Sequence, residues 1–353
     1  MKLYEESRLS TFAAAIFRAA GSEENEAGIV ASHLVESNLV GHDSHGVVRI
    51  TKYVDWVRSG AVVANARAEI VTDRPGSLLI DGHFGYGQVI ARDAMSLLGQ
   101  RAKASGFAVC GIRNAGHLGR VGAWAEQLAR DGLVSFHFVN TSGFGILVAP
   151  YGGTDRRLSA NPIAAGVMAA DGRLVVLDIA TSVIAEGKIQ MARNKHVPLP
   201  EGSVLDGQGR PTTDAAAFYA DPPGAILPFG GHKGSGLSLF CEILAGSLTG
   251  GFASNAASPT AQRLVNNMLS LAFDPAAFAG TAFFQADVDR LIDWATRSRP
   301  LEPSGQILLP GDIEQRTRTE RRAKGIPIDS ETWAQIQKAA LSVGVDAGDY
   351  LSP

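Results

Sequence analysis

A histidine and an arginine lie four positions apart in the segment GHDSHGVVRI, residues 41–50. Ser44 or the aspartate before it is suited to cap a helix, which would place His45 in its first turn and Arg49 and Tyr53 on the same face. A guanidinium can clamp a carboxylate with two hydrogen bonds, and an imidazole can give or take the proton of a neighbouring hydroxyl. The pair therefore suits the interconversion of 2-hydroxy and 2-oxo acids, with Ser44 able to fix an imidazole tautomer. From the spacing alone, a capped helix with a surface His–Arg pair is the simpler interpretation.

The same segment offers a metal-binding alternative. His42, Asp43 and His45 supply three possible ligands close together, and His117 would add a fourth in a metal-dependent hydrolase. Side chains so near in sequence rarely all point at one ion, and the chain contains no H-E-x-x-H motif. We therefore expect no metal.

Two further segments could contact a nucleotide. In RNAGHLGRVGAWAE, residues 113–126, glycines form a tight loop between a β-prone run and a helix, with His117 just before the helix N-terminus. Backbone N–H groups at such an end favour anions such as phosphate. In LVVLDIATS, residues 174–182, Asp178 ends a strand-like run and could receive a ribose hydroxyl. His117 is equally suited to capping, and Asp178 to forming a turn.

A glycine-rich loop brings His232 and Lys233 to the start of an apolar helix within residues 229–251. This arrangement can hold an anion, although glycine-rich loops also serve as plain turns. The segment LLPGDIEQR, residues 308–316, is an acidic turn before the C-terminal helices. No G-x-G-x-x-G motif stands at a strand-to-helix junction, since the nearest match, at residues 143–145, lacks the third glycine. Motif reading alone would therefore miss a dinucleotide site.

Composition excludes several classes of protein. The chain has 353 residues, 45% hydrophobic and 19% charged, as expected of a globular protein. A formal net charge of -3 gives no reason to expect nucleic acid or an anionic membrane as a partner. Glu314 and Glu320 interrupt the basic residues of 316–324, which predicts a solvated helical face. Cys110 and Cys241 lie in apolar runs and predict buried free thiols in a cytoplasmic protein. The charged N-terminus lacks a signal peptide, and the apolar region 268–286 contains an aspartate and a proline, so no membrane span is expected.

Hydrophobic periodicity predicts helices at both ends of the chain. The first 60 residues fit three helices, one capped by Ser10, a second starting at Ser22 and a third over about 45–58. Asp329 or Ser330 is suited to cap a last helix.

The middle of the chain alternates between strand and helix patterns. Short β-prone runs lie at 68–72, 77–81, 107–112, 133–139, 145–149 and 174–179. Helical patterns lie at 90–105, 120–131 and 236–249. The proline-rich stretch 196–228 predicts a long excursion over the surface.

The order of these motifs resembles that of a known family. SHGVVR, RNAGHLGRVG, NPIA with LDIATS, HKGSGLSLFCEILAG and PGDIE occur as in the malate/L-lactate dehydrogenase family, over about residues 5–330. Members of that family act on malate, lactate, sulfolactate, ureidoglycolate, 2,3-diketogulonate and the cyclic imine Δ1-piperideine-2-carboxylate. The resemblance implies an α/β fold that is not of the Rossmann type, with a mainly antiparallel or mixed sheet that binds NAD or NADP. It also implies a homodimer with the active site near the subunit contact. The expected division is a mainly helical substrate and dimer domain, residues 1–75 with 310–353, and an NAD(P)-binding α/β domain, residues 76–309.

The resemblance also implies roles for single residues. His45 is similar to a proton donor and acceptor, Ser44 to its partner in a relay, and Arg49 to a carboxylate clamp. His117 resembles a histidine that some members use as the acid/base, so the choice between the two histidines stays open, with His45 favoured and His117 at the nicotinamide. The residues implied to contact the cofactor are His117, Leu118, Gly119, Arg120, Val121, Asp178, Ile179, Ala180, Lys188, His232, Lys233, Pro310, Gly311 and Asp312.

Two positions depart from the pattern of some members. Many have a threonine that can touch substrate where Ala160 stands here, and the alanine removes that hydroxyl donor. Imine-reducing members carry an acidic residue soon after the ATS motif, where this chain has Lys188, and a cation would oppose an iminium substrate. We therefore expect a small 2-hydroxy or 2-oxo acid as substrate. A cyclic 2-imino acid is the alternative within the family, and a metal-dependent hydrolase or a non-catalytic binding protein are alternatives outside it.

Overall fold

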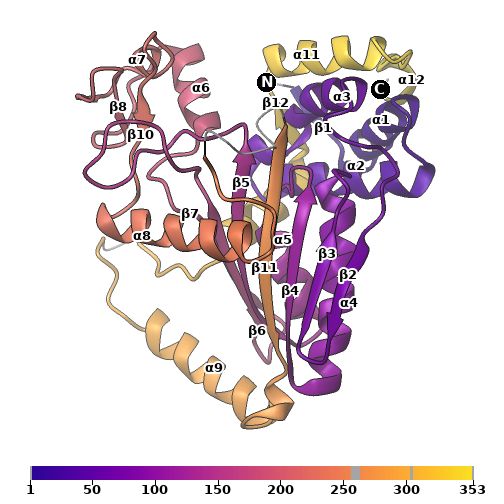
Figure 1. The fold of residues 1–353 in the computed structure, drawn as a ribbon, viewed down its shortest axis with the longest axis vertical. Coiled ribbons are helices and arrows are strands. Elements are labelled where there is room, and N and C mark those ends of the chain that lie inside the picture. The colour runs from indigo at the N-terminus through magenta and orange to yellow at the C-terminus, as the bar shows by residue number, and fades with distance from the viewer. Residues whose placement is uncertain (1, 256–262, 303–304, 352–353) are drawn as a thin grey trace.

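A seven-stranded sheet runs through the middle of the protein (Figure 1). The computed structural model describes residues 2–255, 263–302 and 305–351. The strands lie in the order β2-β3-β4-β11-β5-β6-β7, and only β3 and β4 are parallel neighbours. Their bounds are β2 (Glu69–Arg74), β3 (Ser77–Asp81), β4 (Phe107–Ala115), β5 (Val134–Gly143), β6 (Pro162–Met168), β7 (Leu174–Ala180) and β11 (Leu264–Phe273). The predicted mixed, mainly antiparallel α/β fold is therefore confirmed.

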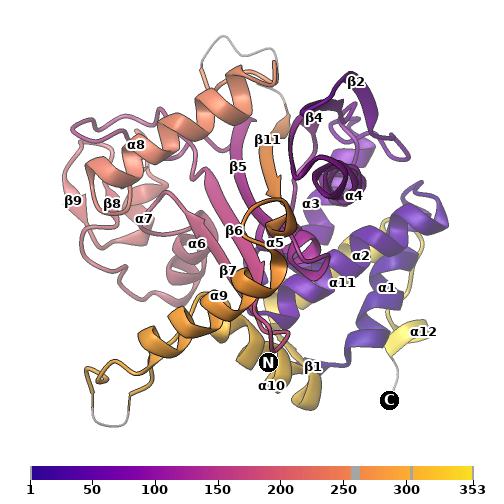
Figure 2. The same cartoon turned by 90° about the horizontal axis from the view of Figure 1, so that it is seen from below.

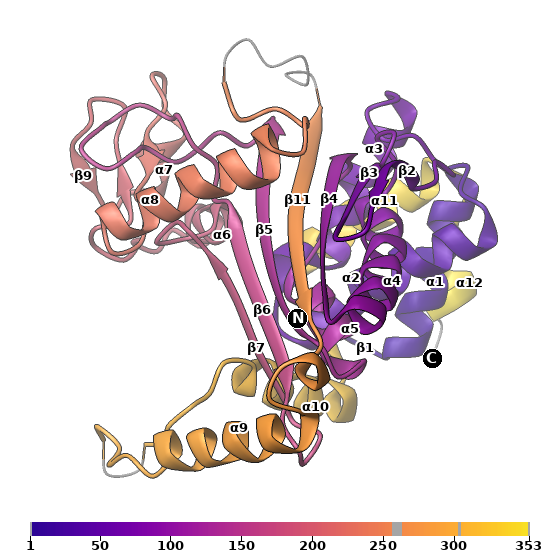
Figure 3. The same ribbon diagram turned by 60° about the horizontal axis from the view of Figure 1, so that its bottom comes forward.

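Helices cover the two faces of the sheet (Figure 3). On one face, α4 (Gly87–Ser105) packs on β4 and α5 (Gly122–Arg130) packs on β5, β6 and β7. Cys110 and Ile112, alternate residues of β4, are buried on this face. On the other face lies α8 (His232–Cys241), which continues as a π-helical turn (Glu242–Ser247). Gly111 of β4 points to that face, where a Cβ atom would lie 3.1 Å from a methyl group of Thr249. Successive residues of β4 thus face the two helix layers in turn.

Two strands of the seven-stranded sheet, β6 and β11, escaped the sequence prediction. The central strand β11 is covered on both faces, so its apolar run shows no alternation that would distinguish it from a helix. In β6, Gly166 lies where a Cβ atom would be 2.8 Å from the backbone oxygen of Ala125 in α5. Small residues there permit close packing but carry little strand propensity. The predicted strand at 145–149 was wrong, since only Val148 of that run makes an isolated bridge.

The predicted surface excursion 196–228 is instead a small folded layer. It contains β8 (Val204–Leu205), β9 (Pro211–Thr212), β10 (Ala225–Ile226) and α7 (Ala215–Phe218), and it packs with α6 (Glu186–Lys195). The side chains of Phe218, Ile226 and Ile189 are fully buried in its core. This layer lies beside α8 (Figure 2).

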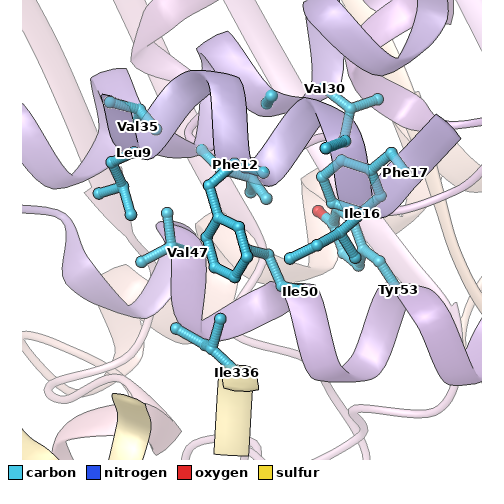
Figure 4. Packing of buried hydrophobic residues seen from close by; sticks show 14 of the residues in the cluster. Leu9, Phe12, Ile16, Phe17, Val30, Val35, Val47, Ile50, Tyr53 and Ile336 are labelled. Atoms are coloured by element: carbon cyan, nitrogen blue, oxygen red, sulfur yellow. The ribbon is translucent and has the colours of Figure 1, made fainter. Parts of the chain in front are cut away.

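Helices from both ends of the chain share one core (Figure 4). The N-terminal members are α1 (Glu6–Ala19), α2 (Glu24–Leu39) and α3 (Ile50–Arg58), and the C-terminal ones are α11 (Ser330–Leu341) and α12 (Gly348–Leu351). Phe12, Ile50 and Ile336 meet in this core, and strand β1 (Lys2–Tyr4) pairs with β12 (Ile326–Ile328) beside it. The predicted cap at Asp329 is confirmed, because its side chain accepts a hydrogen bond from the backbone N–H of Thr332 at 2.9 Å.

Two expectations for the terminal helices were wrong. Helix α1 begins at Glu6, before Ser10, and its N-cap residue makes no side-chain cap. Helix α10 (Asp312–Lys324) is not simply a solvated face, since Arg318 binds Glu36 and Glu126. Helix α9 (Thr281–Thr296) follows the 3-10 turn Pro275–Ala277 and lies at the far end of the sheet (Figure 1).

Ile336 tests whether the two ends of the chain stabilise each other. Replacing Ile336 by Ala removes fully buried apolar volume, so we expect a loss of about 2–5 kcal/mol in the free energy of unfolding. Thermal and urea denaturation would measure it. The matched control is Leu341→Ala on the same helix, whose side chain is 62% exposed. Equal stability of the two variants would contradict a shared core.

Candidate active site

The segment with His45 and Arg49 forms two short turns rather than the predicted capped helix. One 3-10 turn spans Asp43–His45, a second spans Val47–Arg49, and α3 begins only at Ile50. Neither Asp43 nor Ser44 caps a helix with its side chain. The side chain of Asp43 instead accepts hydrogen bonds from Arg321 of α10, at 2.6 and 3.1 Å, and from Asn38 of α2 at 2.6 Å.

Asn38 is a site residue that the sequence analysis missed. Its Oδ1 accepts a hydrogen bond from the backbone N–H of Val47 at 2.8 Å, while its Nδ2 donates to Asp43. Gly46 lies between these two contacts, and a Cβ atom there would collide with the Asn38 amide. The glycine of the SHG motif therefore lets the turn close on α2.

The turn brings His45 against His117. Their rings stack with centroids 5.2 Å apart and an interplanar angle of 6°. His45 Nδ1 is buried without a hydrogen-bond partner among the described residues. Tyr53 hydrogen-bonds His117 Nδ1 at 2.7 Å from the other side. His45 and Tyr53, predicted to share one face, thus both contact His117 of the next segment.

Backbone packing fixes His117 at the end of β4. A Cβ atom at Gly87, the first residue of α4, would collide with the backbone oxygens of Gly116 and His117. The next N–H, of Leu118, donates to Asn266 Oδ1 of β11 at 3.0 Å. His117 is therefore held from α4 and from the centre of the sheet.

Both histidines are neutral at neutral pH. Burial, with the nearby Arg49 guanidinium, holds the pKa of His45 well below its usual value of 6.5. The same two causes, with His45 itself, lower the pKa of His117. Two stacked neutral imidazoles can each donate through one nitrogen and accept through the other.

Arg49 is oriented by its own turn. Its Nε donates to the backbone oxygen of Ser44 at 2.6 Å, and its two terminal nitrogens make no hydrogen bond within the described part of the chain. Those nitrogens are the groups that bind a carboxylate in a forked geometry. The Ser44 hydroxyl hydrogen-bonds neither imidazole in the described structure, so the relay remains a prediction.

The loop after His117 binds back onto α2. Gly119 has φ +74° and lies against His33, where a Cβ atom would collide with the imidazole. His33 Nε2 accepts a hydrogen bond from the backbone N–H of Arg120 at 3.0 Å. The Arg120 side chain is buried and donates to Glu126 at 2.7 Å, and its Nε has no partner among the described residues.

Asp178 lies at the N-terminus of α5. Its Oδ2 accepts a hydrogen bond from the backbone N–H of Gly122 at 2.8 Å. Burial raises the pKa of Asp178 in spite of nearby His42 and Arg120. The PGD turn joins the same region, because the backbone N–H of Val176 donates to the oxygen of Pro310 at 3.1 Å.

A cavity of about 390 Å³ opens between these segments. Its lining includes four residues predicted to contact the cofactor, namely Arg120, Asp178, Gly311 and Asp312. Two of the lining residues, Arg120 and Arg318, have buried Nε atoms without a hydrogen-bond partner among the described residues. A cavity of this size beside unpartnered buried polar atoms fits part of a dinucleotide.

The remaining predicted segments border the same region. The loop before α8 is joined to the end of β7, since the N–H of Phe229 donates to the oxygen of Thr181 at 3.0 Å. This places His232 and Lys233, the first residues of α8, next to that strand end. Lys188 follows Gly187, where a Cβ atom would lie 3.0 Å from Cβ of Ser44.

Ala160 lies before a buried network. Its neighbour Asn161 donates through Nδ2 to Glu242 at 2.7 Å. The oxygen of the same amide accepts from the N–H of Thr141 at 3.2 Å.

Two of the residues considered as metal ligands, His42 and Asp43, bind other side chains. His42 Nε2 contacts Glu314 at 3.1 Å, and Asp43 is paired with Arg321. Within the described ranges, no group of three or more His, Cys, Asp or Glu side chains is placed to hold a metal. Over those same residues, no helix has the length and apolarity required to cross a membrane.

Comparison with known proteins places the chain in a family. The model of the malate/L-lactate dehydrogenase family matches residues 4–337. Hydroxycarboxylate dehydrogenase B of Escherichia coli O157:H7 is 40% identical over 346 residues, 97% of this chain and 94% of that protein. L-sulfolactate dehydrogenase of Methanocaldococcus jannaschii is 35% identical over 334 residues, 94% of each chain. A solved structure of a putative malate/lactate dehydrogenase from E. coli superposes with a TM-score of 0.92 at 39% identity, covering 98% of this chain and 96% of that one.

The chain belongs to the malate/L-lactate dehydrogenase family. It is an oxidoreductase that acts on hydroxy acids, and its family implies a nicotinamide cofactor.

Gly46 tests how tightly the turn must close. Gly46→Ala would force the Asn38 amide aside, so we expect a loss of about 1–3 kcal/mol in stability and a fall in activity. Thermal unfolding and steady-state kinetics would measure both. Gly28→Ala on the same helix as Asn38 is the control, because a Cβ atom there meets nothing within 4 Å. Equal behaviour of the two variants would show that the contact does not constrain the turn.

Proposed function

We propose that the protein interconverts a small 2-hydroxy acid and its 2-oxo acid at the site formed by His45, His117 and Arg49. The observation that carries this is the Arg49 guanidinium, whose terminal nitrogens have no hydrogen-bond partner among the described residues and lie near two stacked neutral imidazoles. The guanidinium binds the substrate carboxylate and holds the adjacent carbon–oxygen bond at the imidazoles. His45 takes the hydroxyl proton during oxidation and returns it during reduction.

The cofactor, NAD or NADP, lies along the segments that border this site. We propose contacts with residues 117–121, with Asp178, Ile179 and Ala180, with Lys188, with His232 and Lys233, and with Pro310, Gly311 and Asp312. When bound, its nicotinamide ring gives or accepts the hydride. The chain's own contribution is to enclose the ring beside His117 and to hold the rest of the dinucleotide along the end of β7 and the cavity at the PGD turn.

A cyclic 2-imino acid is the second candidate substrate. Lys188 follows the residue that packs against Ser44, and its positive charge disfavours an iminium nearby. Ala160 supplies no hydroxyl for a substrate contact. The charge of Lys188 is therefore the feature that favours the 2-hydroxy acid.

Arg49 provides the test of the proposed function. A panel of 2-oxo acids and cyclic imines, assayed with NADH and NADPH, would identify the substrate class. With the best substrate, Arg49→Lys keeps the charge but loses the fork, so we expect KM to rise at least about tenfold, the equivalent of about 1.5 kcal/mol. Arg58→Lys, at the end of α3, is the control. Unchanged KM in Arg49→Lys would reject the clamp.

The pH profile tests the neutral histidines. Since burial and Arg49 depress the pKa of His45 below 6.5, the proton-accepting form persists as the pH falls through 6.5. We expect kcat/KM for oxidation to stay level from about pH 8 to below 6.5 and to fall only at lower pH, where His45 becomes protonated. A midpoint at or above 6.5 for a group on the free enzyme would contradict this.

We further propose a homodimer that uses the outer face of α8. Leu237, Leu239, Phe240 and Ile243 are large apolar side chains exposed on α8 and its π-helical turn. A patch of this kind on a helix that starts at the cofactor site favours contact with a second copy.

The proposed division of the chain has two units. Residues 1–75 with 310–353 would form the helical unit next to the substrate, and residues 76–309 would form the cofactor unit. The buried thiols of Cys110 and Cys241 suit a cytoplasmic location.

A charged substitution on the outer face of α8 tests the proposed dimer interface. Phe240→Asp puts a carboxylate at a side chain that is 58% exposed, so we expect dissociation to monomers in light scattering coupled to size-exclusion chromatography. Trp294→Asp on α9, at a side chain that is 81% exposed, is the control and should stay dimeric. Dissociation by the Trp294 substitution alone would move the interface to α9.

A further inference from the structure

Three side chains form a hydrogen-bonded chain behind the histidine pair. Gln88 Nε2, from the first turn of α4, donates to the Tyr53 hydroxyl at 2.6 Å. The same hydroxyl contacts His117 Nδ1 at 2.7 Å. Gln88 is fully buried and Tyr53 nearly so, so water cannot replace either contact. These hydrogen bonds therefore link Tyr53, in the core shared by the terminal helices, to the imidazole of His117.

The direction of this chain follows from counting protons. A phenol has one hydrogen to donate, and its oxygen can accept another. Because Gln88 donates to the Tyr53 oxygen, the phenolic hydrogen is directed at His117 Nδ1. Nδ1 must then be the accepting nitrogen, and the proton of the neutral ring lies on Nε2.

We propose that Gln88 and Tyr53 are positioning residues that hold His117 in its Nε2–H tautomer, so that His117 presents a hydrogen-bond donor to the substrate oxygen and His45 alone accepts the substrate proton. This assignment rests on the proposed function of the site, and it divides the work between two stacked rings. During oxidation the hydroxyl proton passes to His45 as the hydride leaves for the cofactor. During reduction the same proton returns from His45 to the oxygen.

Packing around the phenol keeps the chain in one geometry. The ring of Tyr53 contacts Phe17 at 6.2 Å, Trp56 at 5.5 Å and Tyr86 at 5.8 Å between centroids. Gln88 follows Gly87, which has no room for a side chain against the backbone of His117. Gln88 and His117, the two ends of the hydrogen-bonded chain, therefore lie on α4 and just after β4, which pack directly on each other.

The ionisation of the three groups is consistent with this arrangement. Burial raises the pKa of Tyr53, so the phenol keeps its proton at all pH values at which the enzyme would be assayed. Burial and Arg49 lower the pKa of His117, so the ring stays neutral and has one tautomer to select. The Gln88 oxygen is buried without a partner among the described residues. If the Gln88 amide were rotated by half a turn, its oxygen would accept the phenolic hydrogen of Tyr53. The Tyr53 oxygen would then accept from His117, and the His117 proton would lie on Nδ1.

Nitrogen-15 NMR of the histidine rings distinguishes the two directions. In the full-length protein labelled at histidine, with His117→Gln used for assignment, we expect a protonated Nε2 and an unprotonated Nδ1 for His117. Tyr53→Phe should give a mixture of the two tautomers. Tyr86→Phe is the matched control, because it removes a buried hydroxyl from a ring that packs on Tyr53 but does not hydrogen-bond either histidine. A protonated Nδ1 in the wild type, or an unchanged tautomer in Tyr53→Phe, would overturn the proposal.

Kinetics then test whether the tautomer matters. We expect kcat/KM to fall at least about tenfold in Tyr53→Phe and in Gln88→Met, with the dissociation constant of NADH unchanged and with Tyr86→Phe like the wild type. Equal loss in all three variants, or none in Tyr53→Phe, would reject a positioning role. If no 2-hydroxy or 2-oxo acid is turned over by the wild type, the proposed function fails, while the NMR result still decides the tautomer.

Discussion

The carboxylate of Asp43 ties together the segments on which the site depends. It binds Arg321 near the end of α10 and Asn38 near the end of α2, and Asn38 in turn holds the backbone of Val47. The charges of Asp43 and Arg321 pair with each other, and the Asn38 amide donates a further hydrogen bond to Asp43. Neither of these partly buried charges is therefore left without a partner. The turn that carries His45 has little regular structure of its own. Its shape is therefore set by a helix before it and by a helix nearly 280 positions later in the chain.

Much of the fold could be predicted from local patterns, and the failures have a common physical cause. The alternation in β4 and the cap at Asp329 depend on near neighbours and were predicted correctly. The turn at residues 43–49 was taken for a capped helix because its stabilising partners are distant in sequence. Strand β11 was missed because it is buried on both faces, which removes the alternation that marks a half-exposed strand.

The same division holds for the site. Spacing and residue type were enough to propose His45, Arg49 and Tyr53 together, since they lie close in sequence. Asn38, His33 and Gln88 were missed, because a polar residue inside a helix gives no sign of what it touches. The cavity at the PGD turn was beyond motif reading as well. It exists because the backbone of Pro310 pairs with Val176, and only the resemblance to a family connected those two segments.

A buried polar network completes the support on the far face of the sheet. Glu242 of the π-helical turn accepts hydrogen bonds from Asn161 at 2.7 Å and from Asn140 at 2.9 Å. Asn267 of β11 donates to Asn140 Oδ1 at 2.9 Å. A network in which every member has partners favours one arrangement of its elements over alternatives. It fixes the backbone beside Ala160 through side chains that are themselves buried.

The position of β11 has a consequence for how the protein is made. Its two neighbours, β4 and β5, are translated more than a hundred residues earlier, yet β11 lies between them. Until it leaves the ribosome, the growing chain holds two half-sheets whose unpaired edges can bind other extended chains. The helical core waits longer still, because α1 and α3 need α11. The segment that brings Arg321 to Asp43 is also translated after β11, and α11 follows it, so the turn that carries His45 gains its distant partners only near the end of synthesis.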